Sequence, residues 1–318
     1  MNQLSYAIGF LMDPFATLNL ATDTSLLCMD ELLVRGHRVF WLEQADLDLV
    51  SGVLLGRLQE VLATAPLQLA AAEFAGLDFL DALLIRKDPP FDASYLHLTY
   101  LLDFLPGKVR CLNSPAALRN INEKLATLRW PTVAPETLVT LDAGRLEAFV
   151  RVHGRVVVKP LDECSGRGIL FFSQASPTLR QDLEAALLLP SGAPRYMLAQ
   201  RYLPAVAAGD KRVYMLSAEP VGWVNRVPAP GKDLANIHQG ASCEATTLTS
   251  SERSICAVVG QWLVTQDVLL AGLDFIGGLL TEINVTSPSA VRQINAVNGV
   301  HLEQQLVDGI LKSILRCR

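Results

Sequence analysis

The segment covering residues 272–288, GLDFIGGLLTEINVTSP, restricts the possible folds of this chain more than any other part. Two short apolar stretches are joined by a Gly-Gly pair, which is typical of a β-hairpin turn. Because side chains alternate between the two faces of a strand, Glu282 and Asn284 must point the same way. Asp274 lies on the partner strand and can face them across the ladder. The segment therefore predicts two carboxylates and an amide on one face of a largely buried hairpin.

Oxygen-bearing side chains grouped in this way suit a hard divalent cation. Mg²⁺ prefers oxygen ligands, and it usually shares its remaining positions with phosphates and water. Without a cation, we expect like charges at this spacing to repel and to raise each other's pKa. A solvated sheet face with unrelated acids is the alternative, but the flanking residues are too apolar for a wet face. We therefore predict a metal site for Mg²⁺ or Mn²⁺ at Asp274, Glu282 and Asn284.

A metal site of this kind calls for cations that hold phosphates. The basic residues near strand or helix ends are Lys124, Lys159, Arg212 and Arg226. Lys159 directly follows three consecutive valines, and a half-buried lysine needs an anion. The next turn contains Ser165, Gly166 and Gly168, whose backbone N–H groups could cover phosphates. Two glycines also make an ordinary hairpin, so the turn alone does not establish a phosphate loop.

The order of the predicted elements indicates an α/β fold. In the first third, strand-like and helix-like segments alternate, which predicts a parallel sheet covered on both faces. There we expect strands at 4–13, 37–43, 80–87 and 108–113, and helices at 24–36, 94–105 and 115–128. Further on we expect strands at 155–160, 168–172 and 196–204, a hairpin at 211–227 turning at Glu219-Pro220, a long loop at 228–244 and a helix at 250–269. This change of pattern predicts a domain at 1–121 and a second at 122–318.

Composition excludes several classes of protein. Of the 318 residues, 50% are hydrophobic and 19% are charged, enough for a large core. The net charge of −5 argues against nucleic acid as a partner, since binding a phosphate backbone needs a basic surface. No apolar run reaches the roughly 18 residues of a membrane helix, and no basic region precedes the first apolar segment as in a signal peptide. Six widely spaced cysteines without a C-x-x-C pair indicate a reduced, cytoplasmic protein without a zinc site.

Several distinctive segments follow one another along nearly the whole chain. They are MDPFATLNLATDTS (12–25), IRKDPPFD (85–92), LRNINEKL (118–125), PETLVT (135–140), KPLD (159–162), AQRYLP (199–204), GDKRV (209–213), GLDFIGG (272–278) and TEINVTSP (281–288). This ordered set resembles the bacterial glutathione synthetases among the ATP-grasp ligases. The resemblance implies an ATP-grasp fold preceded by a Rossmann-like, pre-ATP-grasp domain. It also implies a smaller central lid subdomain at about 125–200.

The resemblance also implies a reaction. ATP phosphorylates a substrate carboxylate, and an amine attacks the acyl phosphate to form an amide. The metal ligands would be Asp274, Glu282 and Asn284. Phosphate contacts would come from Lys124, Lys159 and Arg212, with Ser165 and Gly166 in the loop, and the adenine slot from Gln200, Arg201, Tyr202 and Leu203. Arg86, Asp88, Arg226 and Ser287 would grip a γ-glutamylcysteine-like dipeptide, and the catalytic residues would be Arg212 and Arg226. The expected second substrate is glycine or another amino-acid-like amine, and the expected assembly is a homo-oligomer, a dimer or tetramer.

Two loops depart from the family pattern. The first loop lacks the family's glycine-richer stretch and has Glu163-Cys164-Ser165-Gly166 and Arg167-Gly168 in its place. The positive charge of Arg167 can compensate the negative charge of Glu163. In the second loop, 236–244, Gly240 and Glu244 are retained, Ser242 stands at the family's arginine position, and His238 and Cys243 are new. Without that arginine, the carboxylate of glycine should bind more weakly, since losing one charge-assisted hydrogen bond costs roughly 1.5 to 3 kcal/mol. The acceptor can therefore differ from glycine.

Three readings therefore stay open beside glutathione synthesis. One is a specialised biosynthetic ligase with a different acceptor. Another is a non-catalytic nucleotide-binding homologue, supported only by the altered phosphate loop. A third is a ligase in which Cys164 or Cys243 acts covalently.

Overall fold

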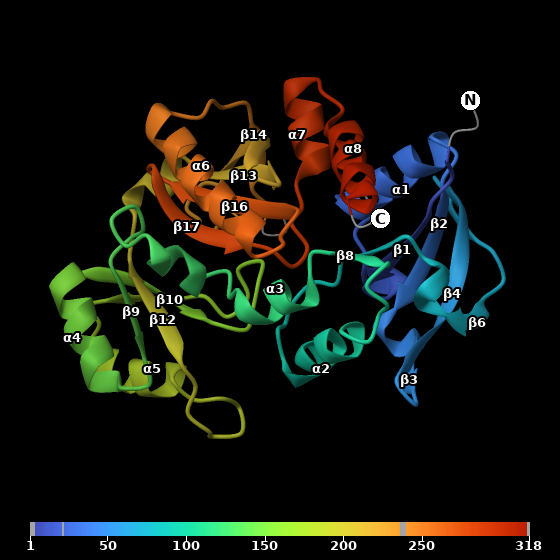
Figure 1. Ribbon diagram of the computed structural model, residues 1–318. Helices are drawn as coiled ribbons and strands as arrows, with labels where there is room; N and C mark the ends of the chain where they lie inside the picture. The colour runs from blue at the N-terminus through green and yellow to red at the C-terminus, as the bar shows by residue number, and fades with distance from the viewer. Residues whose placement is uncertain (1–3, 21, 236–239, 317–318) are drawn as a thin grey trace.

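The computed structural model describes residues 4–20, 22–235 and 240–316, which form three β-sheets with helices around them (Figure 1). The N-terminal sheet contains four parallel strands in the order β2-β1-β7-β8. Their bounds are β1 Ala7–Met12, β2 Arg38–Glu43, β7 Ala82–Ile85 and β8 Arg110–Leu112. The helices α1 Thr24–Val34, α2 Ala93–Leu102 and α3 Pro115–Asn120 connect them or follow them. The predicted parallel sheet is confirmed.

Residues 44–79, for which the sequence led to no prediction, extend this sheet with an antiparallel arm. The arm is built on one long strand, β4, which pairs with three shorter strands and with β2. The strands are β3 Leu47–Val50, β4 Val53–Thr64, β5 Leu67–Leu69 and β6 Glu73–Gly76. The N-terminal sheet is therefore mixed, with its parallel strands next to the rest of the molecule.

A second, four-stranded sheet forms the part of the molecule that we call the lid, residues 137–201. All its pairings are antiparallel, in the order β11-β10-β12-β9, and its own core lies beneath α4 and α5. The elements are β9 Thr137–Thr140, α4 Ala143–His153, β10 Arg155–Pro160, β11 Leu170–Ser173, α5 Leu179–Ala186 and β12 Met197–Arg201. The lid lies at one end of the molecule, far from the N-terminal arm (Figure 1).

The third sheet has five antiparallel strands in the order β15-β14-β13-β16-β17. The elements are β13 Asp210–Leu216, β14 Glu219–Val227, β15 Ser242–Glu244, α6 Ser250–Thr265, β16 Leu270–Ile276, β17 Leu279–Asn284, α7 Val291–Asn298 and α8 Leu302–Leu315. The first hairpin turns at Ser217 and the next residue, two positions before the predicted Glu219-Pro220, because Leu216 already pairs with Glu219. Ser217 makes the turn in the left-handed region, with φ of 55°.

The predicted helix at 115–128 is wrong in its second half. α3 ends at Asn120, where Ile121 adopts extended backbone angles, and a short 3₁₀ segment follows at Leu125–Arg129. The side chain of Asn122 accepts hydrogen bonds from the backbone of Lys124 and Leu125, both at 3.1 Å. An Asn side chain that bonds its own backbone competes with helix formation. Lys124 therefore lies on the connection after α3 and not on a helix.

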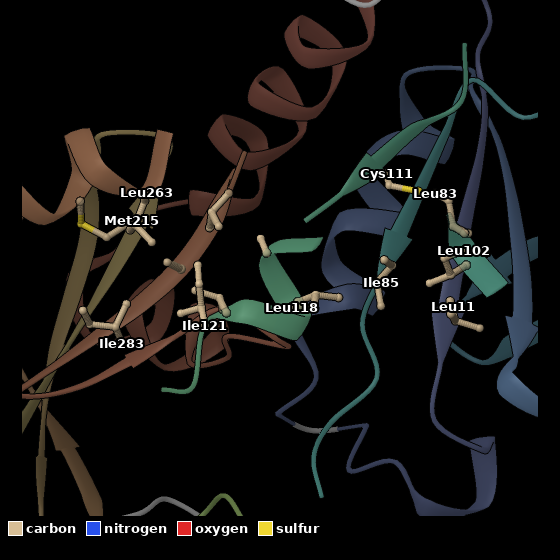
Figure 2. Packing of buried hydrophobic residues seen from close by; sticks show 14 of the residues in the cluster. Leu11, Leu83, Ile85, Leu102, Cys111, Leu118, Ile121, Met215, Leu263 and Ile283 are labelled. Carbon is tan, nitrogen blue, oxygen red and sulfur yellow. The ribbon is translucent and has the colours of Figure 1, made fainter. Parts of the chain in front are cut away.

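One apolar core runs across both halves of the chain. Figure 2 shows Leu118 and Ile121 between Leu11 and Leu83 on one side and Ile283 on the other. A second core joins α1 to the C-terminal helix α8, which returns to the N-terminal sheet. The domain boundary near residue 121 stays a prediction, because the C-terminal helices pack on the N-terminal half. Within the described residues, none of the helices has the length and apolar character required to cross a membrane.

Candidate active site

The hairpin of β16 and β17 brings the three predicted metal ligands together. Its register sets Asp274 opposite Glu282 and Gly272 opposite Asn284. The side-chain amide of Asn284 donates to Asp274 Oδ2 at 3.1 Å and to the carbonyl oxygen of Gly272 at 3.3 Å. The three oxygen-bearing groups therefore share one face of the sheet, as the alternation of side chains requires.

Two arginines from neighbouring strands neutralise Asp274. Arg212 donates from Nε to Oδ1 at 2.5 Å and from Nη2 to Oδ2 at 2.9 Å, and Arg226 Nη2 lies 3.1 Å from Oδ1. Burial acts to raise the pKa of Asp274, but the two guanidinium charges together hold that pKa well below its usual range. The repulsion expected between the acids in the absence of a cation does not decide the pKa of Asp274, because the sheet supplies two cations.

Arg226 lies between two buried carboxylates. Its Nη2 is 2.7 Å from Asp210 Oδ2 on β13 and 3.1 Å from Asp274 Oδ1 on β16, and its side chain is only 4% exposed. Burial raises the pKa of Asp210 to about 6, although the charge of Arg226 opposes this. Arg226, for which the sequence predicts a substrate contact, is thus already held by acids of the chain itself.

The donor set fits a divalent cation that also has phosphate ligands. Glu282 Oε1 accepts from Lys159 Nζ at 3.2 Å, and Glu282 Oε2 and Asn284 Oδ1 have no protein partner among the described residues. Asp274 would join them by releasing part of its contact with the arginines. No group of three His, Cys, Asp or Glu side chains in the described parts of the chain could hold a metal by itself. Oxygen donors of this kind are those that Mg²⁺ accepts.

A polar cavity of about 390 Å³ opens beside this hairpin, between the N-terminal and C-terminal sheets. The predicted residues that line it are Arg86, Asp88, Ser165, Arg212, Arg226, Glu282, Asn284 and Ser287. Arg86 is buried and oriented by Ser25 Oγ at 2.9 Å and the carbonyl oxygen of Pro288 at 2.8 Å. Burial raises the pKa of Asp88. A fixed guanidinium facing a cavity is suited to binding a carboxylate.

A second, narrower cavity of about 80 Å³ lies between the lid and the C-terminal sheet. The predicted residues that line it are Lys159, Gly166, Gln200, Arg201, Tyr202, Leu203 and Glu282. Its other walls are largely apolar, with Val157, Ile169, Phe171, Leu234 and Ile276 among them. A small cavity with largely apolar walls suits a nucleotide base. Glu282 lines both cavities, so they meet at the predicted metal site.

Two of the predicted site residues line neither cavity. Asp274 is 2% exposed and lies under the arginines. Lys124 is buried, and its ammonium group donates to the carboxylate of Glu123 at 2.6 Å and to the carbonyl oxygen of Glu163. The prediction that Lys124 contacts phosphate would therefore need its side chain to leave these partners.

The sequence analysis missed several acidic residues of the two cavities. Asp13 and Glu123 line the larger cavity, and Asp210 and Asp233 line the smaller one. The first three lie inside the segments MDPF, NEKL and GDKRV, so their position in those motifs is a signal that was not used. Asp233 accepts from Tyr202 Oη at 2.6 Å, and no local pattern in its loop predicts that contact.

The cysteines near the site are poor nucleophiles. Burial raises the pKa of Cys164 to about 11 and also raises the pKa of Cys243, which pairs with Arg226 across β15 and β14. A thiol with such a pKa is almost entirely protonated near pH 7. His238 lies outside the described residues. The structure therefore gives no support to a covalent role for either cysteine.

Comparison with known protein families identifies both halves of the chain. Residues 6–119 match the sequence model described as the prokaryotic glutathione synthetase N-terminal domain, and residues 123–299 match the prokaryotic glutathione synthetase ATP-grasp domain. A protein of Shewanella oneidensis named glutathione synthetase is 36% identical over 309 residues, covering 95% of this chain and 97% of that protein. Another of that name, from Coxiella burnetii, is 37% identical over 310 residues, covering 96% of each.

Solved structures share the fold at low sequence identity. The D-cycloserine synthetase DcsG superposes with a TM-score of 0.69 at 13% identity, covering 98% of this chain and 100% of that one. The ATP-grasp ligase PsnB, solved with a minimal precursor, Mg and ADP, gives a TM-score of 0.62 at 16% identity, covering 96% of this chain and 98% of that one. These likenesses extend over both halves, including the lid.

Proposed function

Because the chain belongs to the prokaryotic glutathione synthetase family of ATP-grasp ligases, we propose that it joins γ-glutamylcysteine to glycine with ATP. As a member of that family it is an enzyme that forms carbon–nitrogen bonds. The observation that carries the choice of substrates is the pair of cavities that share Glu282. One is polar and lined by arginines, and the other is narrow and largely apolar. A carboxylate substrate and a nucleotide would meet at their junction.

In the first step, a carboxylate oxygen of the dipeptide attacks the γ-phosphorus of ATP. The bond from the γ-phosphorus to the bridging oxygen breaks, ADP leaves with that electron pair, and an acyl phosphate forms. We propose that Lys159 and Arg212, which line the cavities on either side of Glu282, hold the phosphates. Positioned cations stabilise the charge that develops on the transferring group.

In the second step, the amine nitrogen of glycine attacks the acyl carbon, and inorganic phosphate leaves with the electrons of the C–O bond. The nitrogen loses a proton, and the amide is formed. Exclusion of water from the larger cavity while the acyl phosphate exists would favour attack by the amine over hydrolysis.

We propose that Asp274, Glu282 and Asn284 hold Mg²⁺, or Mn²⁺ in its place. The ion would supply positive charge to the β- and γ-phosphates when bound. Arg212 and Arg226 then have a second function in this site, since they keep Asp274 ionised and in position before the ion arrives.

Arg86 and Asp88 are the residues that we propose for the dipeptide. Arg86 is held by Ser25 and Pro288, so that its guanidinium is oriented without substrate. Burial raises the pKa of Asp88, and the nearby side chain of Ser287 acts against this rise. A carboxylate and an ammonium group on one substrate would match an arginine and an aspartate that lie two residues apart.

The test is an assay with ATP, Mg²⁺, γ-glutamylcysteine and glycine. Phosphate release that depends on all four, together with the tripeptide mass, supports the proposal. A Lys159→Met variant serves as the control for catalysis at this site. Absence of phosphate release with a panel of γ-glutamyl dipeptides and amines would rule out the proposed substrates.

A different acceptor is the second candidate. Ser242, which stands at the family's arginine position, is exposed at the start of the edge strand β15. No cation at this position can therefore hold the carboxylate of an acceptor. A competition among amino acids, read by product mass, distinguishes glycine from the alternatives. The homo-oligomer and the reduced, cytoplasmic environment stay predictions.

A further inference from the structure

Arg167 connects the loop after Lys159 to the segment that carries Arg86. Its Nη2 donates to the carbonyl oxygen of Pro89 at 2.8 Å, and its Nε donates to Glu163 Oε2 at 2.8 Å. The side chain is 52% exposed and lines the larger cavity. One side chain thus bridges the lid and the N-terminal domain at the entrance to the cavity.

The loop of residues 161–168 is held from both sides. On the N-terminal side, the backbone N–H of Phe91 donates to the carbonyl oxygen of Asp162 at 2.9 Å. On the other side, the buried ammonium of Lys124 donates to the carbonyl oxygen of Glu163. The loop is therefore placed by contacts with other segments and not only by its own strands.

The backbone of this loop needs such external contacts. Ser165 adopts φ of 55°, in the left-handed backbone region that residues other than glycine rarely occupy. Gly166 and Gly168 follow with φ of 80° and 67°. Because a serine in this region costs free energy, neighbouring contacts must hold the turn in place. The bridge from Arg167 to Pro89 is one of them.

The segment that receives this bridge also faces the substrate cavity. Arg86 and Asp88 precede Pro89, and Pro90 follows it, so that two adjacent rings restrict the backbone that presents the Pro89 carbonyl. Arg86, Asp88, Pro89 and Arg167 all line the larger cavity. An anion bound by Arg86 would therefore stabilise the same segment that Arg167 contacts.

We propose that Arg167 is a positioning residue that couples binding of the carboxylate substrate to binding of ATP. When the substrate fixes segment 86–91, the bond from Arg167 to Pro89 also fixes the loop at 161–168. Gly166 of that loop lines the nucleotide cavity. The inference rests on the proposed function for the identity of the two ligands. A coupling free energy between two sites is reciprocal, so each ligand tightens the binding of the other by the same factor.

The experiment measures the Kd of the ATP analogue AMPPNP with Mg²⁺ by calorimetry, with and without saturating γ-glutamylcysteine. For the wild type we expect the dipeptide to tighten binding about fivefold or more, the usual lower range of coupling between sites. For Arg167→Ala we expect the ratio to fall within about twofold of one, because the bridge to Pro89 is lost. Arg167→Gln serves as a second variant if the alanine variant folds poorly.

Arg180→Ala is the matched control. Arg180 lies on α5 of the same lid, is 53% exposed and pairs with Glu184 four residues away, as Arg167 pairs with Glu163. The control should keep the wild-type ratio. The double variant Glu163→Gln/Arg167→Ala tests whether Arg167 only neutralises an acid, and it should stay uncoupled.

A wild-type ratio near one, a wild-type ratio in Arg167→Ala, or recovery of the ratio in the double variant would each overturn the proposal. Phosphate release by the wild type with the full substrate mixture is measured in parallel. If phosphate is released while the coupling is absent, the coupling alone is refuted. If no phosphate is released with any dipeptide, the proposed function fails and the coupling of these two ligands fails with it.

Discussion

Replacing Arg226 by methionine should destabilise the protein in a manner that depends on pH. Methionine keeps much of the apolar volume but removes the charge between Asp210 and Asp274, which lie 2.7 and 3.1 Å from Nη2. Arg212 still pairs with Asp274, so Asp210 is the acid left without its cation. Breaking a buried ion pair by removing one partner costs about 3–5 kcal/mol. We expect a loss of this size near pH 8.

The sign of the pH dependence follows from the pKa of Asp210. Burial raises it from 3.8 to about 6 in the folded protein even with Arg226 present, and removal of the guanidinium raises it further. A folded-state pKa above the unfolded value means that the folded protein is destabilised as pH rises through that interval. At pH 5 the folded variant takes up the proton and escapes much of the penalty. The destabilisation should therefore be smaller at pH 5 than at pH 8.

Urea unfolding at the two pH values measures this, with Asp210→Asn and the double variant Asp210→Asn/Arg226→Met completing a cycle. The double variant should recover part of the loss, since it has no unpaired acid at position 210. Arg180→Met, which removes an exposed arginine, should cost at most about 0.5 kcal/mol at either pH. An equal loss at pH 5 and pH 8, or strictly additive effects in the cycle, would refute the assignment of the penalty to Asp210.

Other predictions concern the nucleotide, the thiol and the packing of α6. Lys159→Met should weaken AMPPNP binding about 10- to 100-fold through the loss of a charge-assisted contact, and an unchanged Kd from calorimetry would contradict the phosphate role. Cys164→Ala should keep ligase activity within about twofold, because burial raises the pKa of that thiol to about 11, and inactivation would revive a chemical role. Gly260→Ala should lower the free energy of unfolding by about 1–3 kcal/mol, since a Cβ there would lie 2.2 Å from the carbonyl oxygen of Ala218, whereas Gly107→Ala, with open space around it, should be neutral in the same urea experiment.

Local patterns predicted the elements with clear periodicity or caps. The helix that begins at Thr24 is capped by Asp23, whose side chain accepts from Leu26, and the hairpin from Leu270 to Asn284 turns at its two glycines. Both signals lie within a few residues of the structure that they produce. The antiparallel arm in residues 44–79 carries no comparable local signal, because its long strand is stabilised by pairing with four separate partners.

The candidate site was predictable in its residues more than in its contacts. The motifs predicted Arg86, Asp88 and Ser287 as substrate contacts, and all three line one cavity. It did not reveal that Asp274 is ion-paired with Arg212, because that contact joins residues 62 positions apart in the chain. The charge state of a buried acid depends on neighbours from other strands, so the lowered pKa of Asp274 could not be predicted from its own hairpin.

The return of α8 to α1 has a consequence for synthesis on the ribosome. Leu26, Met29 and Leu32 of α1 share a core with Ile310 and Ile314 of α8, which are synthesised much later. Part of the apolar surface of the emerging N-terminal half therefore stays exposed to water until α8 has left the exit tunnel. Such a nascent chain is expected to be a client of chaperones that shield hydrophobic surface during translation, and a premature stop before α8 should leave a product that aggregates.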